Sequence, residues 1–223
     1  MSIMSKTTRL VLAIVFLIAV CLGGVYLFTF SQHHGATTIS QSPPKVHGLM
    51  LTTPRMLPPF SLTTDRNKPF TEARLKGHWS FMFFGFTHCP KVCPTTMAAM
   101  NKMYQRLAQS LPKSQLPQVI MVSVDPNRDT VTRMHDYVTT FNPNFIGLTG
   151  SMPVLKSMQH SMHVFAEKIA THTAHQQHYD MRHTAAVMVI GPKGQLRGFL
   201  SYPQKPDEMI ADYKAIIKAY PNA

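Results

Sequence analysis

The chain has 223 residues, 44% hydrophobic and 14% charged, and its 22 basic and 10 acidic residues give a formal net charge of +12. This composition is typical of a globular protein with a buried core. The basic residues are scattered, and no basic run with interleaved aromatic side chains stands out, which argues against a nucleic-acid-binding protein. The positive charge fits an anionic lipid surface or an acidic protein partner equally well.

The N-terminal region predicts a membrane anchor. Residues 10–30 contain no charged side chain and are long enough to cross a bilayer as a helix. Lys6 and Arg9 precede this run, whereas the next basic residue after it is Lys45, and this asymmetry predicts a cytoplasmic N-terminus. A cleaved signal peptide is the alternative, but its apolar region would be shorter and no good cleavage site follows.

The chain is therefore expected to divide into distinct segments. They are a cytoplasmic N-terminus (residues 1–9), a transmembrane anchor (10–30), a polar linker (31–48) and a folded domain (49–223). The anchor is expected in a bacterial inner membrane, with the domain in the oxidising periplasm. Cys21 lies inside the anchor, where it is most simply a small apolar residue.

The first half of the domain alternates strand and helix patterns. A short strand is expected near Leu49, and residues 60–64 and 69–70 are expected to pair as a hairpin. The aromatic and apolar run of residues 79–86 predicts a buried strand, and a helix is expected over residues 93–110.

The middle of the domain repeats this alternation. Residues 119–124 form a continuous apolar run, typical of a buried strand, and the next helix is expected to start near Asp125 and Asp129, both interpreted as caps. A short strand over residues 145–148 precedes a further helix, which Ser151 can cap.

The C-terminal part supplies a hairpin and a last helix. A polar, histidine-bearing stretch over residues 171–182 is expected to be a loop. Residues 185–190 and 195–200 are expected to form a hairpin, and an amphipathic helix carries apolar residues from Met209 to Tyr220. This order predicts an α/β fold with a mixed central sheet flanked by helices. A cysteine pair after an early strand makes a thioredoxin-like architecture the best fit.

Cys89 and Cys93 stand between the strand of residues 79–86 and the helix that follows. A helix N-terminus favours thiolate over thiol, because its unpaired N–H groups and its dipole stabilise negative charge. Residues i and i+4 lie on one face of a helical turn, so both sulfurs can bind one metal ion or each other. A purely structural disulfide would close a very short loop and stabilise little. The pair is therefore predicted to be a redox or soft-metal site.

Three chemistries use such a pair. Thiol–disulfide exchange needs a low-pKa thiolate with a second thiol, and peroxide reduction needs one activated thiolate. A soft-metal site needs both thiolates and commonly a third ligand. Of the 12 histidines, His183 is the best candidate for that ligand, since it lies just before the strand of residues 185–190. His88 adjoins Cys89 and is a candidate to donate a hydrogen bond to the site.

Two further sets of residues suggest metal binding but have simpler explanations. The polar stretch and the helix before it carry His163, His172, His175 and His178. Their spacing is more typical of an exposed loop than of a second metal site. The helix after the cysteine pair carries Met97, Met100 and Met103. Their helical spacing is more typical of a core than of a relay of thioether ligands.

Residues 84–96, with the sequence FGFTHCPKVCPTT, closely resemble the signature of the SCO/SenC family. Residues 122–130, VSVDPNRDT, are similar to a second motif of that family, and this resemblance implies a nearby structural role for Asp125 and Asp129 as the alternative to caps. His183 and Thr184 are similar to a third motif, which contains the distal metal histidine. The resemblance spans roughly residues 54–220 and rests on three motifs in the expected order.

The resemblance implies a membrane-anchored, thioredoxin-like copper chaperone. It implies a Cu(I) or Cu(II) site formed by Cys89, Cys93 and His183, and delivery of copper to the copper-binding subunit of cytochrome c oxidase, at its binuclear copper centre. Oxidation of the cysteines to a disulfide would then prevent copper binding. The alternative function is a periplasmic thiol–disulfide reductase that keeps a partner's cysteines reduced. The three-residue spacing of the cysteines and His183 favour the metal site.

One departure from the family pattern adjoins the expected site. Arg182 stands where the family usually has an acidic residue, directly before the distal histidine. A cation at this position is expected to weaken a metal site or to alter its redox preference. Asp180, three residues before His183, is the candidate to orient the imidazole in place of the missing acid.

Overall fold

The computed structural model describes residues 14–26, 43–170 and 179–221. The chain forms two compact units, Met1–Gln41 and Ser42–Ala223. Each unit has its own internal contacts and is described by itself below.

In the first unit, residues 14–26 form a helix that contains Cys21, a free and exposed cysteine. Among the described residues, no helix is both long enough and apolar enough to cross a membrane. The anchor expected over residues 10–30 extends beyond this helix at both ends, into residues outside the described part, and it stays a prediction.

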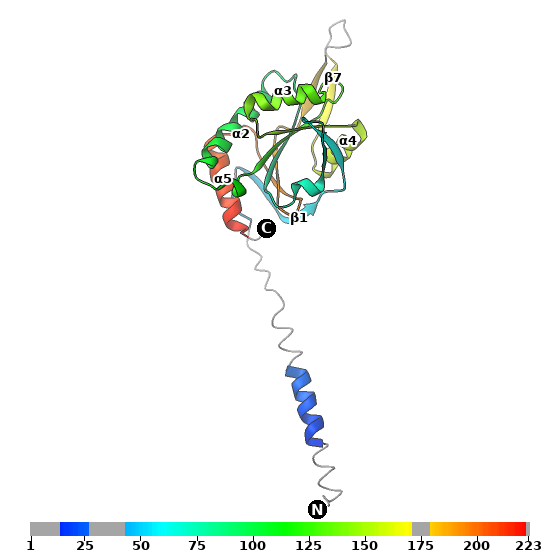
Figure 1. Ribbon diagram of the computed structural model, residues 1–223, viewed down its shortest axis with the longest axis vertical. Coiled ribbons are helices and arrows are strands. Elements are labelled where there is room, and N and C mark those ends of the chain that lie inside the picture. The colour runs from blue at the N-terminus through cyan, green and yellow to red at the C-terminus, as the bar shows by residue number, and fades with distance from the viewer. Residues whose placement is uncertain (1–13, 27–42, 171–178, 222–223) are drawn as a thin grey trace, which may run out of the picture. The chain divides into compact units, whose positions relative to one another are not determined.

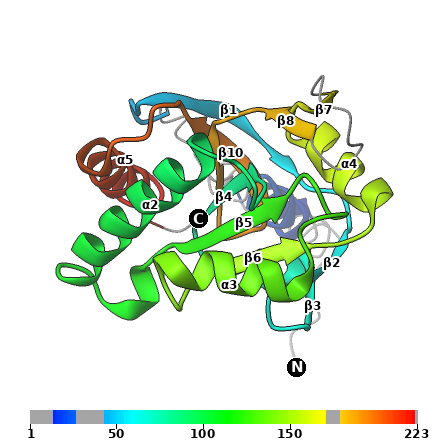
Figure 2. The same ribbon diagram turned by 90° about the horizontal axis from the view of Figure 1, so that it is seen from above.

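The second unit is built on a mixed sheet whose strands follow the order β1-β10-β9-β4-β5-β6-β2-β3 (Figures 1 and 2). These strands are β1 (Gly48–Met56), β2 (Ser61–Thr64), β3 (Pro69–Thr71), β4 (Ser80–Gly85), β5 (Gln118–Ser123), β6 (Ile146–Thr149), β9 (Val187–Ile190) and β10 (Gln195–Leu200). A second, two-stranded sheet pairs β7 (Ala166–Ala170) with β8 (Tyr179–His183).

Helices pack around the central sheet. They are α2 (Val92–Ala108), α3 (Val131–Phe141), α4 (Met152–Ser161) and α5 (Pro206–Ala219), together with the short 3-10 helices η1 (Glu72–Leu75) and η2 (Lys113–Gln115). In Figure 2, α2 and α5 lie side by side, and α3 packs against β6. The predicted α/β fold with a mixed sheet flanked by helices is confirmed.

The strand directions explain the position of the functional residues. The central strand β4 runs parallel to β5 and antiparallel to β9, and β5 runs parallel to β6. Every residue of β4 is buried, as expected for a strand covered on both faces. The segment that carries the cysteines therefore leaves the sheet at the carboxyl end of its central strand.

The methionines of α2 are part of the core. Met97, Met100 and Met103 have no exposed surface and belong to the main apolar cluster. Their helical spacing places them on the face of α2 that packs inward. The interpretation of these residues as core is confirmed.

The predicted caps at Asp125 and Asp129 are wrong. Thr130 precedes α3, and its hydroxyl oxygen accepts a hydrogen bond from the Arg133 N–H at 3.2 Å. Asp125 instead binds Arg128, and Asp129 is buried beside the cysteine segment. Both aspartates are used in tertiary contacts, which a local pattern does not reveal.

Two further expectations are corrected in part. Ser151 occupies the cap position of α4 but forms no capping side-chain bond. Of the stretch expected as a loop, residues 179–182 are part of β8, whereas residues 171–178 lie outside the described residues. No main-sheet strand pairs with β7 or β8, and the side chains of β8 are only partly buried or exposed. A two-stranded sheet of this kind does not require apolar residues at alternate positions. The polar sequence of residues 179–182 therefore did not predict a strand.

The cap of α3 gives a testable prediction. Replacing Thr130 with Ala removes the acceptor for the Arg133 N–H, so the free energy of unfolding should fall by about 1 kcal/mol. Urea denaturation of the variant against the wild type measures the change. Thr132→Ala, two residues further along the same helix, is the matched control. Equal stability of the two variants would contradict the assignment of the cap.

Candidate metal centre

Three side chains from separate segments converge at the carboxyl end of β4. The Sγ atoms of Cys89 and Cys93 and a ring nitrogen of His183 all lie within 4.8 Å of one another. Cys89 lies in the segment after β4, Cys93 in the first turn of α2, and His183 at the end of β8. Among the described residues, this is the one group of His, Cys, Asp or Glu side chains that could hold a metal ion. All three residues predicted for the site are therefore brought together.

Cys89 places its sulfur at the N-terminus of α2. The Cys93 N–H donates to Cys89 Sγ at 3.4 Å, and the first turn of α2 has no acidic side chain. A hydrogen bond from the Cys93 thiol, with further bonds from the backbone of Cys93 and Lys91, lowers the pKa of Cys89 to about 3. A thiolate at this position supplies the negative charge that helix N-termini favour.

Cys93 is buried, and its pKa is shifted in the opposite direction from that of Cys89. Its side chain has no exposed surface, and its pKa is raised because its thiol donates to Cys89 and because burial disfavours the charged form. The metal-free pair therefore consists of one thiolate, Cys89, and one thiol, Cys93. Cys89 is only partly buried, so the charged sulfur is also the accessible one.

Gly85 provides space for the buried sulfur. A Cβ atom at this position would lie 3.1 Å from Cys93 Sγ and 2.7 Å from the Phe83 ring. Neither neighbour is free to move far, because both have no exposed surface. The glycine between the two phenylalanines of the first motif is thus explained by packing against the site.

His183 is oriented by its own neighbour in the chain. Its Nδ1 lies 3.0 Å from the Thr184 carbonyl oxygen, so Nδ1 carries the proton and donates. Nε2 is then the free nitrogen, and it lies 3.5 Å from Cys93 Sγ. The rings of Phe83 and Phe86 pack edge-on against the imidazole, with centroids 5.7 and 5.8 Å away. The ring is therefore held with its ligand nitrogen toward the sulfurs.

A buried carboxylate holds the segment that carries Cys89. Asp129 accepts hydrogen bonds from the Thr87 N–H at 3.1 Å and the Thr87 hydroxyl at 2.7 Å. Its second oxygen accepts from the Ser123 hydroxyl at 2.6 Å, at the end of β5. Burial raises the pKa of Asp129, although these bonds act in the opposite direction. Asp129 thus fixes the cysteine segment to the neighbouring parallel strand.

Arg128 connects the same region to the strand that carries His183. Its guanidinium forms an ion pair with Asp125 and donates to the Tyr179 carbonyl oxygen at 3.0 Å. It also stacks on the Tyr179 ring, 3.7 Å from the centroid, and lies 5.8 Å from that of Phe86. The Tyr179 hydroxyl donates to Asp125 at 2.5 Å. These contacts fasten the start of β8, four residues before His183, to the loop after β5.

The expectation for Asp180 is wrong, whereas the effect of Arg182 on a bound metal stays a prediction. Arg182 is exposed and forms an ion pair with Glu167 at 2.7 Å, so its charge is paired outside the site. Side chains alternate along a strand, and Arg182 and His183 therefore point to opposite faces of β8. Asp180 accepts from the Met181 N–H, while the carbonyl of Thr184 orients His183.

Within the described part of the chain, no other histidine joins the cluster. His88 is exposed, and its Nδ1 lies 3.2 Å from the Thr87 hydroxyl and 4.0 Å from Asp129. Burial and the nearby Arg133 and Arg128 lower its pKa. His163 binds Arg55 at the surface. The remaining histidines considered for a second metal site, His172, His175 and His178, lie outside the described residues.

Sequence reasoning missed several residues that hold the site. Asp129, Arg128 and Tyr179 form its supporting contacts, and Gly85 gives it space. Asp129 and Arg128 lie in the second motif, which follows a buried strand parallel to the cysteine-bearing one. That position in the sequence pointed to a structural role near the cysteines. Tyr179 lies in a polar stretch and carried no signal of its own.

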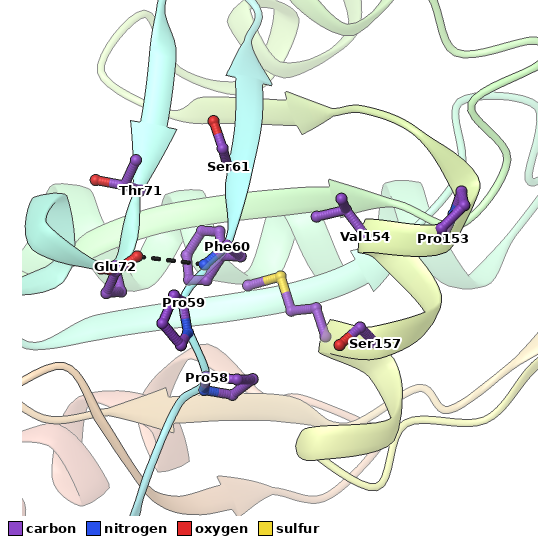
Figure 3. A pocket seen from close by; sticks show the side chains of 10 residues that line it. Pro58, Pro59, Phe60, Ser61, Thr71, Glu72, Pro153, Val154 and Ser157 are labelled. Atoms are coloured by element: carbon purple, nitrogen blue, oxygen red, sulfur yellow. Dashed lines mark hydrogen bonds between the residues drawn. The ribbon is translucent and has the colours of Figure 1, made fainter.

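A separate pocket of about 560 Å³ lies between the start of β2 and α4 (Figure 3). Its walls include Pro58, Phe60, Glu72 and Val154. Glu72 already accepts a hydrogen bond from the Phe60 N–H at 3.3 Å, which is drawn as a dashed line in Figure 3. None of its lining residues belongs to the Cys–Cys–His cluster.

The donor set of the cluster fits a soft metal ion. Two sulfurs and one imidazole nitrogen are ligands that copper accepts in both of its common oxidation states. A closed structural zinc site would need a fourth ligand, and no other His, Cys, Asp or Glu of the described residues joins the group. The same two sulfurs also suit thiol–disulfide exchange, because one is an exposed thiolate and the other a buried thiol.

Comparison with known proteins supports this assignment. A family model described as SCO1/SenC matches residues 50–218. A Stutzerimonas stutzeri protein whose name describes copper binding is 33% identical over 159 residues, covering 71% of this chain and 76% of that protein. The Arabidopsis thaliana mitochondrial protein SCO1 homolog 1 is 41% identical over 110 residues, covering 49% of this chain and 32% of that protein. The chain thus spans about a third of the mitochondrial relative's length.

A solved structure is similar over 73% of this chain. The crystal structure of Arabidopsis thaliana ScoI with copper bound is 31% identical and has a TM-score of 0.65, covering 73% of this chain and 99% of that chain. The likeness confirms the thioredoxin-like architecture predicted for the domain.

The thiolate at the helix N-terminus gives a prediction for the reduced, metal-free protein. Between pH 8 and pH 5 the alkylation rate of Cys89 by iodoacetamide should change by less than about twofold, because its thiolate persists to low pH. Peptide mapping by mass spectrometry separates Cys89 from the other cysteines. Cys93→Ala removes the thiol that donates to Cys89, so this variant should lose reactivity at pH 5. A rate for wild-type Cys89 that falls tenfold per pH unit would contradict the assignment.

The contacts of Arg128 give a second prediction. Arg128→Met should accelerate amide hydrogen exchange in β8 by about tenfold or more, because the variant loses a charged hydrogen bond and an ion pair. Arg182→Met is the matched control, since Arg182 lies in β8 itself but points away from the site. If both variants exchanged at the same rate, Arg128 would not be what holds β8 in place.

Proposed function

This chain belongs to the SCO1/SenC family, and we propose that it is a copper chaperone. In this proposal it delivers copper to the copper-binding subunit of cytochrome c oxidase while that enzyme is assembled. The observation that carries the proposal is the convergence of Cys89, Cys93 and His183 within 4.8 Å, on a fold shared with copper-bound relatives. Copper, as Cu(I) or Cu(II), is the cargo.

The described residues suggest how the cargo is held. The thiolate of Cys89 and the deprotonated sulfur of Cys93 supply soft donors, and His183 Nε2 supplies the nitrogen that Cu(II) favours. Binding must displace the proton of Cys93, whose pKa is raised in the metal-free site. His183 Nδ1 donates to the Thr184 carbonyl oxygen, which leaves Nε2 as the nitrogen that faces the sulfurs.

The burial of the ligands suggests how the cargo leaves. Cys89 and His183 are partly exposed, whereas Cys93 has no exposed surface. Incoming ligands of a partner protein would therefore replace Cys89 and His183 first, and Cys93 would release the ion last. Both cysteines must be reduced for this exchange, so a disulfide between them would prevent loading.

The proposal includes a membrane location. The uncharged run of residues 10–30 would anchor the chain in a bacterial inner membrane, with residues 1–9 in the cytoplasm and the domain in the periplasm. An anchor of this kind would keep the domain near its membrane-bound partner.

A second candidate function is a periplasmic thiol–disulfide reductase. The asymmetry of the cysteine pair favours it, because Cys89 is an accessible thiolate and Cys93 a buried thiol. Cys89 would attack a partner disulfide, and Cys93 would then resolve the mixed disulfide. Two electrons and the proton of Cys93 would pass to the partner as Cys89 and Cys93 form their own disulfide, and the partner's other sulfur would take its proton from solvent.

The metal ligands give a prediction about copper affinity. His183→Ala should weaken Cu(II) binding by more than about a hundredfold and Cu(I) binding far less, because two thiolates alone can hold Cu(I). Competition titration with a chelator measures both affinities, and His88→Ala is the matched control. Unchanged Cu(II) affinity in His183→Ala would remove this residue from the site. Stoichiometric copper retained by a Cys89→Ser, Cys93→Ser double variant would refute the whole assignment.

The two functions are separated by following copper and thiols independently. The copper-loaded protein is incubated with the copper-binding domain of the oxidase subunit, whose cysteines are reduced beforehand, and in parallel the metal-free protein is incubated with the oxidised domain. A chaperone transfers copper in the first reaction, and a reductase reduces the partner's disulfide in the second. We expect transfer of copper, because thiol exchange has no need of His183. Normal cellular oxidase activity in His183→Ala, with none in either cysteine variant, would favour the reductase instead.

A further inference from the structure

The charges of the domain are distributed unevenly between the two ends of the central sheet. The Cys–Cys–His cluster lies at the carboxyl end of β4, whereas exposed cations gather around the amino ends of β4 and β5. We call these cations the basic end: Arg66, Lys68, Arg74, Lys76, Lys113, Lys193, Lys214 and Lys218.

Strand pairing places the loops of the basic end together. Ser80, the first residue of β4, pairs with Gln118 of β5 and with Ile190 of β9. The segments before β4 and β5 and the turn after β9 therefore lie at one end of the sheet. The Gly77 N–H donates to the Pro192 carbonyl oxygen at 2.8 Å and joins two of these segments. Because β2 runs antiparallel to β6, the turn after β2 lies at this end as well.

Few carboxylates balance these cations. The sequence has no Asp or Glu between residues 73 and 124 or between residues 213 and 223. Of the basic end, only Arg66 forms an ion pair within the described part of the chain, with Asp65 at 3.7 Å. At the opposite end of the sheet, in contrast, the cations Arg128 and Arg182 are both paired with acids.

The nearby carboxylates are directed inward. Asp65 is buried and accepts from the Gly147 N–H at 3.1 Å. Glu72 points into the pocket of Figure 3, where the Phe60 N–H binds it. Neither acid therefore neutralises the surface of the basic end.

Two hollows lie within the basic end. One, of about 380 Å³, is lined by Arg66, Lys68 and Arg74, and no carboxylate lines it. The other, of about 460 Å³, has the cations Lys214 and Lys218 in its wall, again without a carboxylate. Cations around a hollow that no carboxylate lines provide a place for a phosphate group.

Aromatic side chains accompany the second hollow. Trp79 and Tyr220 both line it, and their rings pack with centroids 6.0 Å apart. The guanidinium of Arg197 lies 3.8 Å from the Tyr220 ring centroid. Trp79 is buried, so the pair belongs to the wall of the hollow, and the exposed groups beside it are the cations Lys214 and Lys218.

We propose that the basic end binds the anionic headgroups of a phospholipid bilayer. Each Lys or Arg close to an anionic membrane contributes about 1 kcal/mol to the free energy of membrane binding, so several together attract the domain to the surface. The cations are spread over several separate loops, an arrangement that suits many separate headgroups better than one acidic segment of a protein. Binding by this end would leave the Cys–Cys–His cluster directed away from the bilayer, open to a partner protein. The binding itself does not depend on copper.

The experiment measures how fast individual lysines are acetylated in the full chain reconstituted into bilayer nanodiscs. Nanodiscs of phosphatidylcholine alone are compared with nanodiscs that also contain phosphatidylglycerol, and peptide mapping reads each lysine. With the anionic lipid, Lys68 and Lys218 should react at least about threefold more slowly, and raised salt should reverse this protection. Lys91, which lies beside the Cys–Cys–His cluster, should react at the same rate in both kinds of nanodisc.

Matched charge reversals test the surface. Lys76→Glu with Lys193→Glu should abolish the protection of Lys68 and Lys218, whereas Lys102→Glu with Lys156→Glu, the same charge change on α2 and α4, should leave it. Copper binding should be unchanged in both double variants, so a failure here is distinct from a failure of the proposed function.

Three results would overturn the inference. Equal acetylation with and without phosphatidylglycerol would exclude lipid binding. Protection by inorganic phosphate in neutral nanodiscs, with none added by phosphatidylglycerol, would indicate a free-anion site. Protection by polyglutamate but not by the anionic bilayer would indicate an acidic protein partner.

Discussion

The distance of 3.5 Å between Cys93 Sγ and His183 Nε2 joins residues that are 90 positions apart in the chain. The other contacts at the site keep Cys93 and His183 close together. The N-terminus of α2 sets the position of the cysteines, and Gly85 leaves space for the buried sulfur. His183 belongs to a two-stranded sheet outside the main one, so its position depends on contacts that fasten this sheet.

Two neighbouring residues in the loop after β5 connect the halves of the site. Asp129 binds the segment that precedes Cys89, and Arg128 binds the start of the strand that ends at His183. A single loop therefore positions both the sulfur ligands and the nitrogen ligand. Each contact is buried or partly buried, where an ion pair or a charged hydrogen bond is strongest and its loss is most costly. The second motif of the sequence is explained by this role, although it supplies no metal ligand itself.

The sequence predicted the order of strands and helices because apolar runs and helical periods are local signals. It also predicted the three residues Cys89, Cys93 and His183, which the structure brings together. It could not predict that Asp125 and Asp129 form tertiary contacts instead of caps, because a carboxylate before a helix has the same local pattern in either case. Nor could it place β8, whose polar residues face solvent in a two-stranded sheet. Arg182 was expected to disturb the site, but strand alternation turns it toward Glu167.

The central prediction is that the sulfurs of Cys89 and Cys93 and the imidazole of His183 bind one copper ion together. X-ray absorption at the copper K edge of the protein loaded with Cu(II) tests this claim directly. The predicted spectrum contains two sulfur scatterers and one imidazole around each copper, with the imidazole contribution lost in His183→Ala. A spectrum with no sulfur scatterers, or with several imidazoles in place of the sulfurs, would contradict the account.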